Sequence, residues 1–201
     1  MKEKTRDPER TKAKILQAAF REFLEHGRAG ARIDRIADDA GVNKANIYHY
    51  FDSKDGLMDA LLSQQLTQVR QVRAKVPDAF RDRLAYFQDQ QYDDAQWLRL
   101  VTWEALEFDG APVVAEAERA AAWQPLIQGM RQQMSTGKLP KMDPAQLQLS
   151  WVALVTFPVA FPQFTRMITG MDVDDPKFRR ARKRFLKRFA DVFTGDRNVD
   201  R

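Results

Sequence analysis

Apolar residues recur at helical spacing along nearly the whole chain, and this periodicity limits the possible folds more than any other feature of the sequence. The clearest example lies between residues 10 and 23, where one helix face would be formed by Ile15, Leu16, Ala19, Phe20 and Phe23. The other apolar runs that are short enough for strands lack alternating flanks and hairpin dipeptides. The sequence therefore predicts an all-α fold.

Helix-breaking residues divide the chain into two expected domains. Gly27 is placed to end the first helix, and Ser53 is placed to cap a fourth helix that runs toward Pro77. The breaks beyond Pro77 define roughly five more helices. We expect a first domain of three short helices at residues 1–60 and a larger helical domain at residues 61–201.

Composition and motif content exclude several classes of function. The chain has no cysteine and only two histidines, His26 and His49, which excludes thiolate chemistry and leaves too few nitrogen ligands for a zinc site. It has no Gly-rich phosphate loop, nucleophile elbow or catalytic Ser–His–acid set, so we expect no enzyme, no metal and no cofactor. The charged start of the chain does not resemble a signal peptide, and we expect a cytoplasmic protein.

The formal net charge of +5 comes from one short segment near the C-terminus. Residues 177–188 contain eight basic side chains and no acidic one, whereas residues 1–60 contain 12 basic and 11 acidic side chains. Net charge therefore carries no argument for DNA binding, which has to rest on a motif.

The most specific pattern in the chain lies at residues 32–57. A two-turn helix over 33–40 would bury its apolar face, Gly41 would turn the chain, and Asn43 would cap a second helix over 44–51. The N-terminal half of that second helix would project Lys44, Ala45, Asn46, Tyr48 and His49. This arrangement, at about residues 32–51, is a helix-turn-helix, whose second helix enters the major groove of DNA.

The pattern resembles the TetR family of bacterial transcriptional regulators over about residues 10–60. The resemblance is carried by Ile36-Ala37, Ala40 to Lys44, Ile47 to Phe51, Ser53-Lys54 and Leu57. It implies a larger C-terminal domain that binds an effector and forms a dimer. Two positions depart from the family's pattern, because Arg32 stands where Thr or Ser is usual and Ala45-Asn46 replaces a Gly-Thr pair. Both changes bear on the operator sequence rather than on DNA binding.

The chemistry of these side chains suggests their roles on DNA. Phosphate contacts, which fix the register of a protein on the duplex, are expected from Arg32, Lys44, Tyr48 and Lys54. Asn46 suits an adenine edge and Ala45 a thymine methyl group, while His49 could contact either bases or phosphate. In the alternative interpretation, Tyr48 and His49 merely cover the turn. For Asn43, we expect a role as helix cap rather than a direct contact with DNA.

The resemblance implies a homodimer interface built from the last two long helices, at about residues 143–193. Residues 144–165 carry no charge, but Pro158, Pro162 and several polar residues favour a buried helix over a membrane span. The basic residues of 177–188 form a solvated face, or alternatively a further patch for DNA, a membrane surface or the partner subunit. Arg182 falls on the apolar side of that helix and would require a carboxylate across an interface.

The resemblance implies a small-molecule pocket, and we expect it in the acidic and aromatic stretch between Pro77 and Trp123. Its candidate residues are Trp97, Trp103, Glu104, Phe108 and Trp123. A lipophilic cation would suit such a pocket, although aromatic residues at helical spacing more often belong to a core.

The favoured interpretation is a homodimeric repressor that releases a near-palindromic, double-stranded operator when an unidentified small molecule binds. Three alternatives stay open at this point: an activator of the same family, a protein that binds DNA without sequence preference, and an enzyme.

Overall fold

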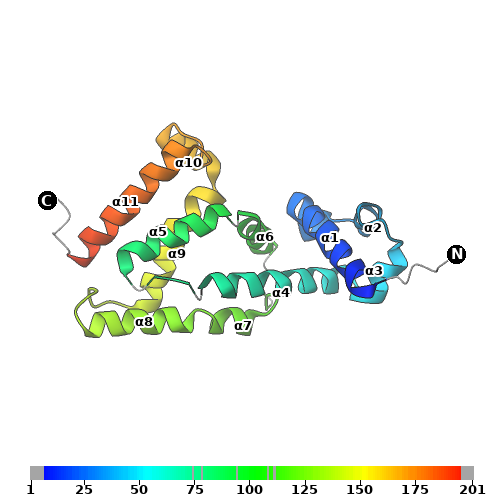
Figure 1. The fold of residues 1–201 in the computed structure, drawn as a ribbon, viewed down its shortest axis with the longest axis horizontal. Helices are drawn as coiled ribbons and strands as arrows, with labels where there is room; N and C mark the ends of the chain where they lie inside the picture. The colour runs from blue at the N-terminus through cyan, green and yellow to red at the C-terminus, as the bar shows by residue number, and fades with distance from the viewer. Residues whose placement is uncertain are drawn as a thin grey trace. The chain divides into compact units, whose positions relative to one another are not determined.

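A computed structural model describes residues 7–73, 75–77, 79–93, 95–107, 109–110 and 112–195; for residues 67–73 and 93 it describes the backbone alone. Within these ranges all regular structure is helical, which confirms the predicted all-α fold (Figure 1). The N-terminal helices are α1 (Pro8–Gly30), α2 (Ile33–Ala40), α3 (Lys44–Phe51) and α4 (Lys54–Arg73). They are followed by α5 (Phe80–Asp93), α6 (Ala95–Leu106), α7 (Glu116–Ala121), α8 (Gln124–Ser135), α9 (Pro144–Ala160), α10 (Pro162–Thr169) and α11 (Pro176–Thr194).

The described residues beyond Pro77 form seven helices, whereas the sequence predicted about five. One additional break falls at Phe161, which has φ −126° and ψ 66° and precedes Pro162. Because proline disfavours helical geometry in the residue before it, α9 ends there, and α10 leaves at 87°. None of the described helices is both long and apolar enough to cross a bilayer alone, and only the bent pair of α9 and α10 reaches that length and composition.

The chain forms two compact units that do not follow the sequence order. The first unit consists of residues 1–69 and 99–116, and the second of residues 70–98 and 117–201. The domain boundary expected between residues 60 and 61 lies inside α4. Residues 99–116, which the sequence analysis assigned to the larger domain, group with the first unit.

The core of the first unit lies where α1, α2, α3 and the start of α4 meet. Its fully buried side chains include Ile15, Phe23, Ile36, Ile47 and Leu57. The helical spacing seen in the sequence therefore places one apolar face of each helix in a common core. This packing fixes the orientation of α3, whose opposite face stays exposed.

The core of the second unit is formed by α5, α8, α9 and α11. Its largest members include Phe80 and Trp151, whose rings stack with centroids 3.8 Å apart, together with Leu84, Met130 and Leu186. Helix α5 packs against both α9 and α11, and α8 packs against α9 (Figure 1).

Asp143 caps α9, because its Oδ1 accepts hydrogen bonds from the backbone N–H groups of Ala145 (2.7 Å) and Gln146 (3.0 Å). The prediction that this apolar segment is a buried helix holds on one side only. Leu147, Trp151 and Val155 are buried, whereas Leu149 and Phe157 are exposed.

Part of the basic face of α11 is paired with acidic residues of α5. The Nζ of Lys183 lies 2.6 Å from Asp89, and the Nζ of Lys187 lies 3.5 Å from Asp82. These two basic residues therefore help to hold α11 against α5.

Arg182 has a hydrogen-bond partner within its own chain, and the carboxylate predicted across an interface stays a prediction. Its guanidinium donates to the backbone carbonyl of Leu154 at 2.7 Å, and burial lowers its pKa. Helix α9 offers a carbonyl at this position because Pro158, four residues after Leu154, has no N–H to donate to it.

Candidate functional site

The turn between α2 and α3 has the geometry of a helix-turn-helix. Gly41 adopts the left-handed conformation, with φ 64° and ψ 39°, and the N–H of Val42 donates to the carbonyl of Ala37 at 3.0 Å. Helix α3 then begins at Lys44, and the Oδ1 of Asn43 accepts from the N–H of Asn46 at 2.9 Å. The predicted roles of Gly41 as the turn and of Asn43 as the cap are both confirmed.

Helix α3 buries one face and presents the other to solvent. Ile47 and Phe51 are buried, while the exposed side chains are Lys44, Ala45, Tyr48 and His49. Asn46 is half-buried, and its side chain makes no hydrogen bond within the part of the chain that the structure describes. These five residues, 44–46, 48 and 49, are called the α3 surface below. Tyr50 is half-buried beside the Nζ of Lys12.

Lys44 of the α3 surface and the neighbouring Arg32 share one carboxylate. The Nζ of Lys44 lies 2.9 Å from Asp34, and the guanidinium of Arg32 lies 3.5 Å from the other oxygen of the same carboxyl. The hydrogen bond from Lys44, opposed by slight desolvation and aided by the charge of Arg32, holds the pKa of Asp34 below its usual range. Arg32 forms no side-chain cap on α2, as its chemistry predicted. Asp34 thus orients two cations toward the same end of the motif.

The ammonium group of Lys54 is hydrogen-bonded within the first unit. Its Nζ donates to the backbone carbonyls of Ala29 (3.4 Å) and Ala31 (3.3 Å), which terminate α1. Ser53 caps α4 as predicted, because its Oγ accepts from the N–H of Gly56 at 2.9 Å. In this structure Lys54 therefore stabilises the end of α1, and a phosphate contact by this residue stays a prediction.

A buried carboxylate that the sequence analysis missed connects α1 to α2. Glu22 accepts hydrogen bonds from the backbone N–H of Arg32 at 2.8 Å and from the guanidinium of Arg35. Burial alone would raise the pKa of Glu22, but these hydrogen bonds, together with the positive charges of Arg35 and His26, lower it. Glu22 lies seven residues after Ile15 on the apolar face of α1, and that position was a signal that could have identified it.

The predicted pocket residues do not come together in one place. Trp103 and Glu104 line a cavity of about 330 Å³ in the first unit. Trp97 and Trp123 belong to the second unit, where the ring of Trp97 lies below the guanidinium of Arg119, 5.8 Å from its centroid. Phe108 lies outside the described residues.

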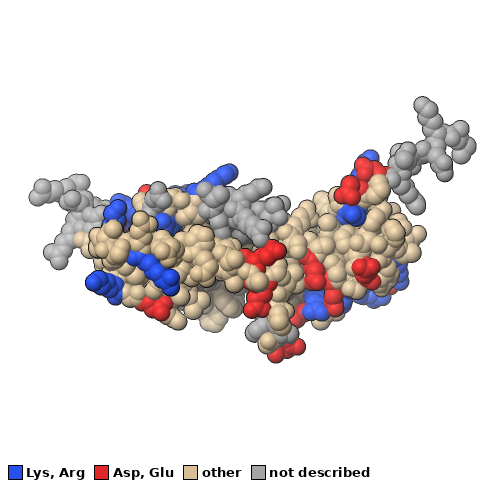
Figure 2. All heavy atoms as spheres, turned by 90° about the horizontal axis from the view of Figure 1, so that it is seen from below, with Lys and Arg blue, Asp and Glu red and all other residues tan. Residues whose placement is uncertain are grey.

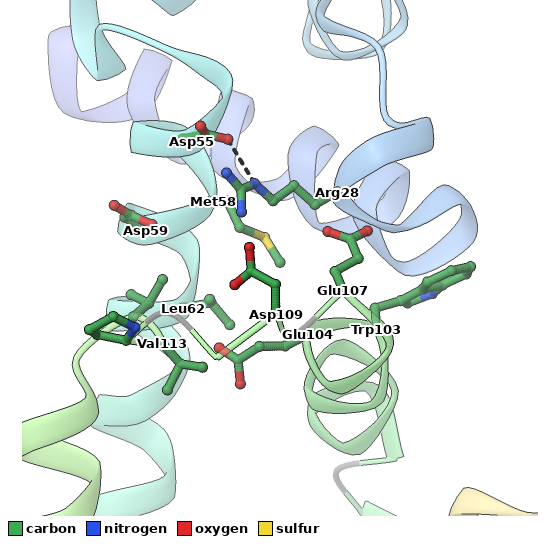
Figure 3. A pocket seen from close by; sticks show the side chains of 12 residues that line it. Arg28, Asp55, Met58, Asp59, Leu62, Trp103, Glu104, Glu107, Asp109 and Val113 are labelled. Atoms are coloured by element: carbon green, nitrogen blue, oxygen red, sulfur yellow. Dashed lines mark hydrogen bonds and ion pairs between the residues drawn. The ribbon is translucent and has the colours of Figure 1, made fainter.

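The cavity is bordered by the end of α1, by α4, and by residues 103–114 (Figure 3). Carboxylates dominate its charged lining, and they are Asp55, Asp59, Glu104, Glu107 and Asp109. Arg28 is the basic member of that lining, and its Nε lies 2.8 Å from the Oδ1 of Asp55. Their hydrogen bond raises the pKa of Arg28 and lowers that of Asp55. This set of residues is called the acidic cavity below.

Trp103 turns its indole toward α1 rather than into the acidic cavity (Figure 3). Its Nε1–H donates to the carbonyl of Leu24 at 3.2 Å, and its ring lies against Gly27, where a Cβ atom would be 2.7 Å from Cε3. The side chain therefore joins α6 to the end of α1.

One face of the molecule carries side chains of both charges. On the face drawn in Figure 2, basic and acidic side chains of the described residues are interspersed, with no continuous basic field. This view shows no basic patch to which DNA binding could be assigned, so the predicted site rests on the individual side chains around α3.

Similarity to known proteins agrees with this geometry. A sequence model described as "Bacterial regulatory proteins, tetR family" matches residues 15–61. The chain is 34% identical, over 92% of its own length and 98% of the relative's, to the HTH-type transcriptional repressor SCO4008 of Streptomyces coelicolor.

Solved structures of similar proteins share the fold along most of the chain. The transcriptional regulator SCO4942 of Streptomyces coelicolor superimposes with a TM-score of 0.75 at 26% identity, covering 90% of this chain and 97% of that one. AibR, solved with isovaleryl coenzyme A and operator DNA, superimposes with a TM-score of 0.67 at 16% identity, covering 92% and 98% of the two chains. The helix-turn-helix, the family match and the full-length similarity lead to one conclusion: the chain belongs to the TetR family of bacterial regulatory proteins.

Proposed function

We propose that this protein is a cytoplasmic, homodimeric transcriptional repressor that releases its operator when a small molecule binds. The observation that carries the proposal is the α3 surface, which a capped and buried helix-turn-helix presents to solvent. Repression is favoured over activation because the relative with 34% identity over nearly its whole length is named a repressor.

On DNA, we assign base recognition to the start of α3 and phosphate contacts to its surroundings. Asn46 carries an amide of the kind that pairs with adenine, and Ala45 offers a methyl group to thymine. Lys44, Tyr48 and Arg32 would contact phosphates, His49 would contact bases or phosphate, and Asn43 would remain the cap of α3. A phosphate would then replace Asp34 as the anion facing Lys44 and Arg32.

Dimerisation would set two α3 surfaces on one operator. Half-sites on a near-palindrome would lie roughly 34–36 Å apart, which is one turn of DNA. Exposed apolar side chains on the last helices of the second unit support an interface there; they include Leu149, Phe157, Phe185 and Val192. Effector binding would favour a spacing that no longer fits the operator.

Fluorescence anisotropy with labelled DNA from the promoter next to the protein's own gene tests the proposal. Asn46→Ala is expected to change the order of preference among single-base operator variants. Lys44→Gln is expected to weaken binding to all of them equally and to reduce the slope of log K against log salt by about one unit.

Lys183→Gln serves as the matched control, since Lys183 pairs with Asp89 in the second unit. This substitution is expected to leave operator affinity unchanged. Equal affinity of the wild-type protein for promoter and shuffled DNA at physiological salt would instead favour a protein without sequence preference. If both α3 variants bind DNA like the wild-type protein, α3 does not enter the major groove.

A further inference from the structure

The size and walls of the acidic cavity suit a small ligand. Its volume of about 330 Å³ lies at the lower end of the range usual for ligand pockets. Met58 and Leu62 of α4, both buried, and Val113 give the cavity an apolar part of its lining. The ligand would therefore be compact and partly apolar.

The charge of the lining selects the sign of such a ligand. Among the described residues that line the cavity, five are carboxylates and one is a guanidinium. Glu104 and Asp109 extend toward the space facing α4, whereas Glu107 extends toward the end of α1 (Figure 3). An anionic ligand would be repelled by this lining, whereas a monocation would be attracted to it. Recognition would rest on carboxylates, because the ring of Trp103 is turned toward α1.

The protein already holds one cation at this site. Arg28 donates to Asp55 at 2.8 Å, and the negative charges of Glu107 and Asp59 also act on its guanidinium. Both partners are about half exposed, so their contact is open to competition from solvent-borne ions. A ligand cation would compete with Arg28 for the carboxylate of Asp55.

Arg28 belongs to the last turn of α1, directly before the segment that joins α1 to α2. It follows the kink at Gly27, and its neighbour Ala29 donates its N–H to Glu107 at 3.1 Å. Helix α2, and with it the helix-turn-helix, starts after Ala31. A change at Arg28 thus acts on the backbone that positions α2.

We propose that the acidic cavity binds an organic monocation with an apolar body, and that this cation displaces Arg28 from Asp55. Displacement removes the ion pair that ties the end of α1 to the first turn of α4, and so loosens the support of the helix-turn-helix. The cavity's choice of ligand stands on the first unit alone, whereas the consequence for DNA rests on the proposed function.

Isothermal titration calorimetry of the full chain without DNA tests the ligand class. The probe is (3-hydroxyphenyl)trimethylammonium, and the control is its uncharged isostere, 3-tert-butylphenol. The cation is expected to bind at least about tenfold more tightly than the isostere, because one charge-assisted contact contributes that much affinity. Equal affinities, or no heat from the cation at millimolar concentration, would overturn the proposal.

Substitutions then locate the site. Asp109→Asn and Glu107→Gln are each expected to weaken binding of the cation by about fivefold or more, since each removes one negative charge. In the second variant the amide oxygen would still accept from the N–H of Ala29, so the backbone contact is kept. Asp89→Asn, in the second unit, is the matched control and is expected to change nothing.

Arg28→Met gives the sharpest result, because it removes the competing cation and should strengthen binding about threefold to tenfold. Arg28→Lys keeps the charge and should bind like the wild type. Weaker binding by a folded Arg28→Met protein, with its cooperative thermal transition retained, would contradict the competition.

The effect on DNA separates the two proposals. The cation is expected to lower operator affinity of the wild-type protein and to have a smaller effect on Arg28→Met, in which the ion pair is already absent. If the chain binds no operator, the proposed function fails, while the calorimetric results still decide the ligand class. If operator binding is specific but indifferent to a bound cation, the coupling through Arg28 is wrong.

Discussion

Carboxylates fix the basic side chains of the first unit in place. Glu22 holds Arg35 and the backbone of Arg32, and Asp34 holds the side chains of Lys44 and Arg32. The basic residues in and beside the helix-turn-helix are thus oriented before any DNA is present. This reduces the loss of side-chain conformational entropy on binding.

Glu22→Gln is expected to destabilise the folded protein by about 2 kcal/mol, because hydrogen bonds to a charged group are lost. The pKa of Glu22 is lowered in the folded state, so its contribution is present above the usual glutamate pKa of about 4.3 and is lost as the pH falls through the folded value. Urea unfolding from neutral to acidic pH checks this: the difference between wild type and variant should shrink as the solution becomes more acidic.

Glu25→Gln is the control for that experiment, since Glu25 is 74% exposed and should have little effect at any pH. A constant difference between Glu22→Gln and wild type across the whole pH range would mean that packing, and not charge, is responsible.

Side-chain hydrogen bonds could be predicted from the sequence where the two partners are close along the chain. The caps at Asn43, Ser53 and Asp143 could be predicted, because each bonds an N–H two or three residues away. The partners of Lys54 and Trp103 could not, because they lie 23 to 79 positions distant and depend on packing.

Two glycines with similar φ values have different functions at the scale of the helix. Gly41, with φ 64° and ψ 39°, turns the chain in open space, whereas Gly27, with φ 65° and ψ −178°, kinks α1 against Trp103. The sequence predicted that Gly27 ends the first helix. In the structure the helix resumes after a kink and extends to Gly30, a difference that depends on contacts with α6.

Gly27→Ala is therefore expected to cost about 3 kcal/mol or more, because its backbone region is nearly exclusive to glycine and its new Cβ would overlap the indole of Trp103. Gly41→Ala should cost only about 1 kcal/mol, from left-handed strain alone. Thermal unfolding of the two variants measures both values.

Asparagine distinguishes the two sites further. Gly41→Asn should recover part of the loss, since asparagine tolerates the left-handed region, and Gly27→Asn should not. Equal costs at both positions would rule out the contact with Trp103 as the origin of the difference.

At the scale of the whole molecule, the helical class and the recognition motif could be predicted from sequence, but the grouping of helices could not. The apolar periodicity of α2 and α3 gave their bounds correctly, because each helix buries one face. Nothing in the periodicity of residues 99–116 indicates that they join the N-terminal helices. The same limit explains why Trp103 was grouped with Trp97 and Trp123.

Exposed apolar residues allow a test of the proposed dimer. Leu149→Arg on α9 and Val192→Arg on α11 are each expected to shift the protein from dimer to monomer, since each buries a charge in an apolar interface. Analytical ultracentrifugation at micromolar concentration gives the measurement. Leu106→Arg is a matched control, because Leu106 is 73% exposed, like Leu149 (63%) and Val192 (69%), but lies outside the last helices.

The grouping of residues 99–116 with the first unit also affects how the protein is made. A ribosome releases the helix-turn-helix residues long before it releases Trp103, which contacts Leu24 from 79 positions away. At translation rates of about 5–20 residues per second, Trp103 is synthesised roughly 4–16 seconds after the end of α1 that its indole contacts. The part of the protein that meets DNA therefore completes its fold only after more than half of the chain has been synthesised.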